Sequence, residues 1–254
     1  MTPALAQLLR ANVIAPRLVV PAQAAEVVSS NIVGYEKVNV PAGMTIVGQQ
    51  FVAVGGTTNT LDGITNAQGL SPWGEDSIRI WDGSSYSDYV YYAYDEDEGS
   101  DGLLDTGKDG WGDNDQKSVD VPLEPGTGFW MVTTGNAKVC VSGEVSSKHT
   151  VSVKAGLSLV CNPQPCAVHI QDIVATGLSP WGEDSLRLWD GTSYSDYVWY
   201  AYDDDEGSEG LLDTLKDGWG DNDQKSVDVT IPAGQGFWIV SGSNATLTFP
   251  NAVQ

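Results

Sequence analysis

The stretch GLSPWGEDSIRIWDGSSYSDYVYYAYDEDEGSDGLLDTGKDGWGDNDQKSVDV, residues 69–121, decides the organisation of this chain because it occurs twice. GLSPWGEDSLRLWDGTSYSDYVWYAYDDDEGSEGLLDTLKDGWGDNDQKSVDV begins at Gly177, and the offset of 108 residues holds without a gap through GFWMV and GFWIV. Outside this block the similarity weakens but continues, as VNVPAGMTIVG near Val38 resembles VSVKAGLSLVC near Val151. Such repetition predicts two homologous domains, at residues 29–142 and 143–254, after an N-terminal segment at residues 1–28.

The pattern within each unit is typical of β structure. Ser77–Trp81 alternates in polarity, Asp82 and Gly83 signal a turn, and Tyr89–Tyr94 is rich in β-forming residues. VNVPAGMTIVG predicts a strand, a turn and a strand, and KSVDV followed by a Pro-Gly turn and GFWMV predicts another strand pair. A helical period is limited to Ala4–Arg10. We therefore predict an all-β chain of two tandem antiparallel β-sandwich or barrel domains, each with roughly seven strands and a long acidic, glycine-rich loop.

The first 28 residues allow two interpretations. Ala22-Gln23-Ala24 has the form of a signal-peptide cleavage site, but Arg10 and Arg17 interrupt the apolar run that a signal sequence needs. The segment is either an atypical signal sequence or an apolar arm that requires a neighbouring surface, its own or another subunit's.

The composition limits the classes of partner. The net charge of −22 repels phosphate groups and anionic lipids, so nucleic-acid and membrane-surface binding are disfavoured. The sequence has no apolar stretch of about 18 residues that could span a membrane as a helix. Calcium or a cationic partner fits this charge, although the charge alone could serve solubility. Few basic residues and many Gly, Asp and aromatic residues are typical of secreted or cell-surface β proteins.

The acidic loop DEDEGSDGLLDTGKDGWGDNDQ, residues 95–116, is unsuited to a helix because it combines many glycines with aspartates at every fourth position. Leu103, Leu104 and Trp111 can anchor it to the core. Because Ca²⁺ is bound by several oxygen ligands, we predict calcium sites with candidate ligands Asp95, Asp97, Asp101, Asp109, Asp113 and Asp115, and Asp203, Asp205, Glu209, Asp217, Asp221 and Asp223 in the second copy. The spacing does not match an EF-hand, and the alternatives are a solvated loop or aspartates that cap turns by accepting backbone N–H bonds.

Aromatic residues recur at matching positions in both copies. Sugar-binding modules stack rings on exposed aromatic faces, and two such sites would give avidity. The candidates for this role are Trp73, Trp81, Trp111, Trp181, Trp189 and Trp219. The alternative is that most of them pack between sheets.

The cysteines and histidines indicate little chemistry. Cys161 and Cys166 flank Asn-Pro-Gln-Pro and are candidates for a small-loop disulfide, with three unpaired thiols including Cys140 as the alternative. The two histidines have no counterparts in the first copy, and no recognised catalytic motif occurs in the sequence. Glu75 and Asp76 are a carboxylate pair, but small duplicated sandwiches offer no obvious deep cleft for a glycosidase. We predict no catalytic residues and no enzyme activity.

SSNIVGYEKVNVPAGMTIVGQQF, residues 29–51, together with GTGFWMV and VSGEV, resembles a family of uncharacterised secreted β-rich proteins of the Planctomycetes–Verrucomicrobia group. The shared elements match Gly34–Gly48 and Gly126–Trp130, and more loosely Val151–Val160 and Gly234–Trp238. The resemblance implies export and a β fold, implies no activity, and does not include the acidic loop.

Two functions of different classes follow. The first is an extracellular or cell-surface structural protein that self-assembles into a filament, tube or layer, with calcium-ordered loops and an N-terminal arm that contacts a neighbouring subunit. Calcium would screen the negative charge that opposes packing of subunits. The second is a bivalent carbohydrate-binding adhesin, which an exposed aromatic strip would favour.

Overall fold

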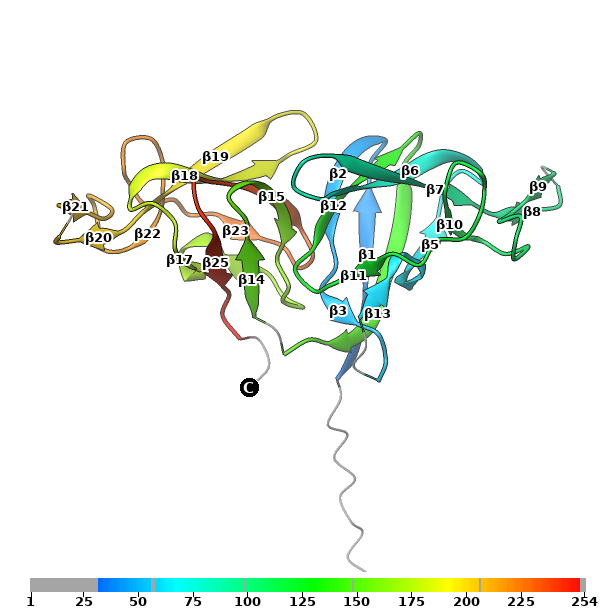
Figure 1. The fold of residues 1–254 in the computed structure, drawn as a ribbon, viewed down its shortest axis with the longest axis horizontal. Helices are drawn as coiled ribbons and strands as arrows, with labels where there is room; N and C mark the ends of the chain where they lie inside the picture. Colours follow the sequence, from blue (N-terminus) through cyan, green and yellow to red (C-terminus); the bar gives the residue numbers. More distant parts are fainter. Residues whose placement is uncertain (1–31, 56–57, 98, 148, 206, 252–254) are drawn as a thin grey trace, which may run out of the picture. The chain divides into compact units, whose positions relative to one another are not determined.

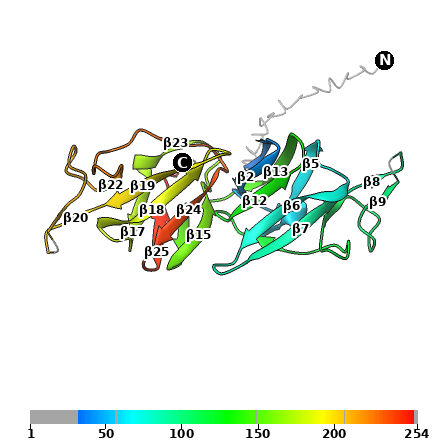
Figure 2. The same cartoon turned by 90° about the horizontal axis from the view of Figure 1, so that it is seen from above.

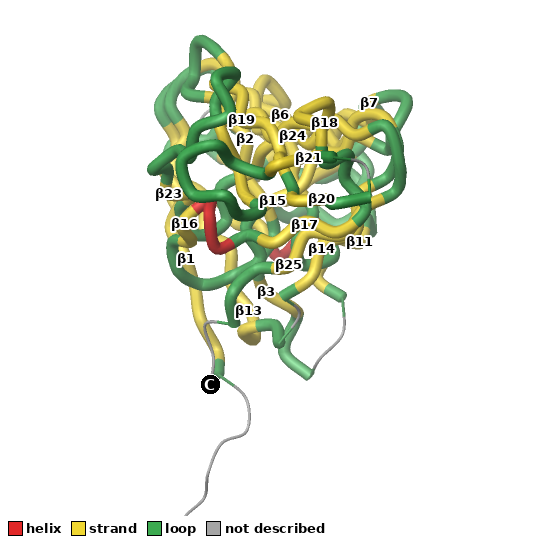
Figure 3. The backbone as a smooth tube through the Cα atoms, turned by 90° about the vertical axis from the view of Figure 1, so that its left-hand side faces the viewer, coloured by secondary structure: helices red, strands yellow, loops and turns green. Residues whose placement is uncertain are grey.

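The computed structural model of the protein describes residues 32–55, 58–97, 99–147, 149–205 and 207–251 (Figure 1). All of them belong to one compact unit, residues 31–254. In the described residues, strands and loops are interrupted by helix only at η1 (Leu61–Gly63) and η2 (Ile170–Asp172), the red segments of Figure 3. The predicted all-β fold with two antiparallel domains is therefore confirmed. The N-terminal segment 1–28 and the helical period at Ala4–Arg10 lie outside the described residues.

The first domain contains two main antiparallel sheets. The five-stranded sheet has the order β10 (Gly110–Gly112), β7 (Tyr86–Tyr92), β6 (Trp73–Trp81), β12 (Gly128–Thr133) and β2 (Gly43–Gly48). In the four-stranded sheet a long central strand pairs with all others, and its members are β13 (Ala137–Val145), β1 (Val33–Val40), β3 (Phe51–Val52) and β5 (Ile64–Gln68). Two short pairs complete the domain, β4 (Asn59–Thr60) with β11 (Pro122–Leu123) and β8 (Tyr94–Asp95) with β9 (Ser100–Asp101).

The second domain repeats this arrangement with a smaller second sheet. Its five-stranded sheet has the order β15 (Gly156–Cys161), β24 (Gly236–Ser241), β18 (Trp181–Trp189), β19 (Tyr194–Tyr200) and β22 (Gly218–Gly220). Its three-stranded sheet has the order β14 (Thr150–Val153), β25 (Ala245–Thr248) and β17 (Val174–Thr176). The short pairs are β16 (Val168–His169) with β23 (Thr230–Ile231) and β20 (Tyr202–Asp203) with β21 (Ser208–Glu209).

The predicted turn at Asp82 closes the hairpin of β6 and β7. Its carboxylate Oδ1 accepts hydrogen bonds from the backbone N–H groups of Ser84 at 2.7 Å and Ser85 at 2.8 Å. These bonds favour the charged form and hold the pKa of Asp82 well below its usual range. Gly83 between them has φ +109°, a conformation that glycine adopts without steric cost.

The predicted strand KSVDV at residues 117–121 is wrong. In this segment only Ser118 forms an isolated bridge, to Gly112. Asp105 explains the difference, because its Oδ1 accepts from the Ser118 backbone N–H at 3.1 Å and its Oδ2 from the Ser118 hydroxyl at 2.6 Å. A side chain thereby takes the donor that a ladder partner would need.

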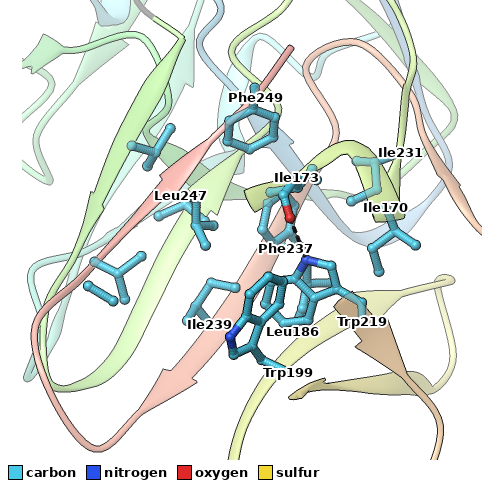
Figure 4. Close-up of a cluster of buried hydrophobic side chains, with 14 of the residues drawn as sticks. Ile170, Ile173, Leu186, Trp199, Trp219, Ile231, Phe237, Ile239, Leu247 and Phe249 are labelled. Carbon is cyan, nitrogen blue, oxygen red and sulfur yellow. Dashed lines mark hydrogen bonds between the residues drawn. The ribbon is translucent and has the colours of Figure 1, made fainter. Parts of the chain in front are cut away.

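Each domain has its own hydrophobic core. The core of the first domain consists of residues between 40 and 141. The core of the second domain consists of residues between 151 and 249, and Figure 4 shows this second cluster. Both cores enclose a tryptophan: Trp111 Nε1 donates to the Ile64 carbonyl at 2.8 Å, and Trp219 Nε1 donates to the Ile173 carbonyl at 2.9 Å. Since a buried indole N–H needs an acceptor, these bonds fix how the loop strands β10 and β22 dock on the core.

The two domains meet through reciprocal tryptophan contacts. Trp81 Nε1 donates to the Leu157 carbonyl of the second domain, and Trp189 Nε1 donates to the Met44 carbonyl of the first, both at 2.9 Å. The ring centroids of Trp81 and Trp238 lie 5.8 Å apart, and Trp130 and Trp189 repeat this distance. Because each contact is matched by its counterpart, the domains are related by a local pseudo-two-fold axis.

The backbones also approach closely at this contact. Isolated bridges join Val47 to Gln235 and Thr127 to Val160, which are again equivalent pairs. A Cβ at Gly128 would lie 2.4 Å from the Val160 carbonyl oxygen, so the glycine of this GFW motif is required by the close approach. The predicted boundary after residue 142 falls within β13, whose last residues Glu144 and Val145 pair with β3.

The predicted disulfide between Cys161 and Cys166 is not formed in the structure. Cys161 is buried at the end of β15, where its Sγ lies 3.4 Å from the Gln49 carbonyl of the first domain. Cys166 is exposed. The Cys161 side chain faces the other domain because its position is equivalent to Gly48, at the pseudo-two-fold contact.

Candidate functional site

The acidic loops extend from the five-stranded sheets beyond β7 and β19. Each loop begins with a two-stranded ribbon, β8–β9 or β20–β21, that projects from its domain (Figures 1 and 2). The contact between the domains uses the tryptophan cluster and not these ribbons.

Aspartates of the loop accept backbone hydrogen bonds at fixed positions. Asp95 Oδ1 accepts from Asp97 N at 3.0 Å, and Asp109 Oδ1 accepts from Tyr94 N at 2.9 Å. Asp113 Oδ1 accepts from Asp115 N at 2.9 Å and from Lys117 N at 3.0 Å. These bonds fit the alternative in which aspartates cap turns.

The second loop repeats every one of these bonds. Asp203 Oδ1 accepts from Asp205 N at 3.0 Å, and Asp217 Oδ1 accepts from Tyr202 N at 2.9 Å. Asp221 Oδ1 accepts from the N–H groups of Asp223 and Lys225 at 2.9 and 3.0 Å. The two loops therefore have the same internal framework.

Asp105 and its counterpart Asp213 were missed as functional candidates. Like Asp105, Asp213 binds a serine, with Oδ1 accepting from Ser226 N at 3.1 Å and Oδ2 from Ser226 Oγ at 2.6 Å. These hydrogen bonds lower the pKa of both carboxyls. The signal for them was available in the sequence as the repeated LLDT, residues 103–106, followed in both copies by QKS at the same distance, residues 116–118.

The calcium hypothesis remains a proposal. Among the described residues, no group of three or more His, Cys, Asp or Glu side chains converges as a metal site. Asp97, Asp101 and Asp115 are exposed and accept no hydrogen bond within the described part of the chain. The same holds for their counterparts Asp205, Glu209 and Asp223. Half of the candidate ligands thus hold the loop together and the other half face solvent.

The six tryptophans proposed to stack on sugars have three different environments. Trp111 and Trp219 are buried in the cores, with exposed fractions of 1% and 0%. Trp81 and Trp189 are partly buried at the contact between the domains. Trp73 and Trp181 are each 50% exposed, so only this pair among the six presents a large aromatic surface.

Trp73 and Trp181 begin β6 and β18, and further exposed apolar side chains lie on the ribbons and loops. Tyr94 and Leu104 are exposed in the first loop, as are Tyr202 and Leu212 in the second. Leu103 and Trp111 anchor the loop as predicted, but Leu104 does not, because its neighbour Leu103 takes the buried position. We use the term loop surface for Trp73, Tyr94, Leu104, Asp97, Asp101 and Asp115, and for their counterparts Trp181, Tyr202, Leu212, Asp205, Glu209 and Asp223.

The carboxylate pair Glu75 and Asp76 has a structural arrangement. Asp76 is fully buried, and its Oδ1 accepts from Thr134 N at 2.8 Å while its Oδ2 accepts from Ser71 N at 2.7 Å. Glu75 Oε2 accepts from the Ser71 hydroxyl at 2.9 Å. These bonds link the start of β6 to the turn after β12 and occupy the Asp76 carboxylate.

No protein-family model matches the chain, and no match was found among curated proteins or solved structures. The resemblance to secreted β-rich proteins therefore stays a prediction. In the described residues, no helix has the length and apolar character needed to cross a membrane.

Proposed function

We propose that the protein is an extracellular or cell-surface structural protein that self-assembles through its two loop surfaces, with no catalytic role. One observation carries this proposal: the exposed loops are nearly identical in the two domains, as similar to each other as the buried strands β6 and β18 or β7 and β19 beside them. Loops normally vary more than cores, so retention of an exposed loop in duplicate favours a contact function.

The duplication supplies the valency that assembly needs. A chain with two equivalent contact surfaces can link to two other chains, and such contacts extend into a filament or layer when they do not close. Trp73, Tyr94 and Leu104 would supply apolar contact area, as exposed apolar groups do at protein interfaces. An N-terminal arm that adds to a neighbouring sheet would strengthen the link.

Charge is the main obstacle to this assembly. Two acidic loop surfaces repel each other, and the chain as a whole has a net charge of −22. The exposed carboxylates of Asp97, Asp101 and Asp115 are the groups that a shared Ca²⁺ would neutralise. Assembly should therefore require calcium and disperse when EDTA removes it.

The test is negative-stain electron microscopy with sedimentation velocity, in calcium and in EDTA. We expect calcium-dependent polymers of the full-length protein. The triple variant D97N/D101N/D115N leaves one loop surface intact and should stop growth at dimers, whereas also changing Asp205, Glu209 and Asp223 should leave monomers. Monodisperse monomers of the unmodified protein in both conditions would refute assembly, and polymers in EDTA would refute the calcium role.

A second candidate function is bivalent glycan binding, which the half-exposed Trp73 and Trp181 favour. A glycan array tests it, followed by titration of W73A, W181A and the double variant. Avidity predicts that each single variant weakens binding to a multivalent glycan surface strongly, while its affinity for a soluble monovalent glycan stays the same at one remaining site. Equal binding by the double variant and the unmodified protein would exclude this role.

A further inference from the structure

The first domain contains a pocket of about 430 Å³ between β5, β10 and the acidic loop. Its lining includes Asp62, Asn66, Tyr91, Leu103, Asp109 and Trp111. A volume of this size is at the small end of the range for ligand pockets. The lining combines apolar surface from Leu103 and two rings with carboxylates, an amide and a hydroxyl.

In the second domain, the side chain of Gln171 occupies the equivalent place. Its Oε1 accepts from the Trp219 backbone N–H at 3.2 Å, and its Nε2 donates to the carbonyls of Trp219 and Val227. The carboxamide therefore satisfies a backbone donor and two backbone acceptors at the outer edge of β22. The adjoining Trp199 packs against Trp219 with ring centroids 5.2 Å apart (Figure 4).

The first domain presents the same backbone groups without that side chain. Trp111 pairs with Tyr91 in the same register as Trp219 with Trp199, so its N–H and C=O also point away from β7. Asp62 stands where Gln171 stands, and no hydrogen bond joins it to Trp111 among the described residues. A Cβ at Gly110 would lie 3.9 Å from Asp62 Oδ1, whereas a Cβ at Gly218 would lie only 2.5 Å from Gln171 Oε1.

Two more substitutions shape the pocket. Tyr91 replaces the larger Trp199, and its burial raises the pKa of the hydroxyl to about 12, so it remains a hydrogen-bond donor at neutral pH. Asn66 lies in a connection that is one residue longer than its equivalent between Ile173 and Gly177, and its side chain bonds the Tyr91 hydroxyl. The first domain thus keeps polar groups where the second domain is filled.

From this comparison, we propose that the first-domain pocket binds an N-acetylated hexosamine, whose acetamido group takes the place that the Gln171 carboxamide holds in the second domain. The acetamido carbonyl would accept from Trp111 N–H, and its N–H would donate to the Trp111 or Val119 carbonyl. Its methyl group would contact Leu103. Asp62, Asn66 and Asp109 would then bond ring hydroxyls, because carboxylates and amides offer the acceptors and donors that hydroxyls need.

A peptide amide presents the same donor and acceptor, but the size of the pocket favours the sugar. A pocket of about 430 Å³ has room for one sugar ring, whereas an extended peptide needs a groove along the sheet edge. The proposal is independent of assembly and does not use Trp73 or Trp181, so it can fail or succeed separately from both proposed functions.

The second domain supplies the residues for a matched test. The variant D62Q/Y91W gives the first domain the side chains with which the same fold fills this place in the second domain. The reverse variant Q171D/W199Y should open a pocket in the second domain. Calorimetric titration with N-acetylglucosamine, glucose and acetyl-glutaminamide measures the affinity and stoichiometry of each protein, and thermal unfolding confirms that each variant is folded.

For the unmodified protein, we expect one N-acetylglucosamine per chain, bound at least about tenfold more tightly than glucose, since glucose leaves the backbone groups unpaired. D62Q/Y91W should lose this binding, and Q171D/W199Y should raise the stoichiometry towards two. No preference for the N-acetylated sugar, or unchanged binding by folded D62Q/Y91W, would overturn the proposal. Tighter binding of acetyl-glutaminamide than of the sugar would overturn the choice of a sugar ligand.

Discussion

The acidic loops of this protein are nearly identical in the two copies, whereas the edge strands β2 and β15 differ at most positions. Within residues 95–116 and 203–224 the loops differ only at Glu96/Asp204, Asp101/Glu209 and Gly107/Leu215. The shorter β2 and β15 differ in most of their side chains, at Met44/Leu157, Thr45/Ser158, Ile46/Leu159 and Gly48/Cys161. The exposed loops have thus stayed as similar as the strands β6 and β7 beside them, although exposed loops are usually free to vary.

Physical requirements of the two regions explain part of this contrast. A hydrophobic core accepts exchanges that preserve volume and polarity, such as Ile46 for Leu159. An aspartate that caps a turn is harder to replace, because its acceptor must reach a particular N–H group. Capping does not explain why Trp73, Tyr94 and Leu104 also recur, since these side chains are exposed, and a contact function would explain them.

The largest expected effect on stability distinguishes a tryptophan buried between the domains from an exposed one. Trp238 is 7% exposed and packs against Trp81 at the contact between the domains, so W238A should lower the free energy of unfolding by about 3–5 kcal/mol. The equivalent change at the half-exposed Trp181 should cost less than about 0.5 kcal/mol. Urea unfolding of W238A and W181A measures both. Similar losses in the two variants would show that Trp181 is not a surface residue.

A smaller effect separates loop capping from core packing. D113A removes the acceptor of two backbone N–H groups and should cost about 1–2 kcal/mol, with faster proteolysis within the first loop. D113N keeps an acceptor oxygen and is the control. I46L introduces the residue of the second domain and should cost less than about 1.5 kcal/mol. If D113N were as damaging as D113A, charge and not capping would dominate.

The one glycine that differs between the loops gives a stabilising prediction. Leu215 has φ +55° and is exposed, while its equivalent Gly107 has φ +63°. A non-glycine residue in this conformation is strained by roughly 1–2 kcal/mol, part of which the entropy of a glycine offsets. L215G should therefore raise stability by roughly 0.5–1 kcal/mol, as measured by thermal unfolding. The opposite change G107L should lower it, and a stabilising G107L would contradict this account.

The smallest effect concerns pH. Hydrogen bonds hold the pKa values of Asp82, Asp105, Asp190 and Asp213 below their ordinary value of 3.8. Because the folded-state pKa is lower than the unfolded one, these groups contribute stability that is complete above pH 3.8 and is lost as the pH falls through their folded-state values. Changing all four to Asn should make the melting temperature less dependent on pH below 3.8. Parallel melting profiles of variant and unmodified protein would exclude this contribution.

The sequence predicts the repeat, the β class and the main hairpins, because these depend on local alternation and turn residues. The buried Leu103 and Trp111 also follow from an acidic loop that needs an apolar anchor. The environments of the other tryptophans do not follow, since Trp73 and Trp81 lie at the two ends of the same strand and differ only in what packs on them. Trp81 is covered by the second domain, whose approach no local pattern specifies. The predicted strand KSVDV is wrong for a similar reason, because Asp105, which lies outside this segment, binds Ser118.

The reciprocal contact between the domains has a consequence for how the chain selects its partner. The second domain of another chain presents the same contact surface to a first domain as the chain's own second domain does. Because the contact is reciprocal, both domains of each chain can be exchanged in this way. The first domain prefers the second domain of its own chain because the connection between Val145 and Thr150 keeps the two domains at a high local concentration. Shortening that connection would turn one closed molecule into two interlocked ones, and refolding at high protein concentration would favour the same exchange.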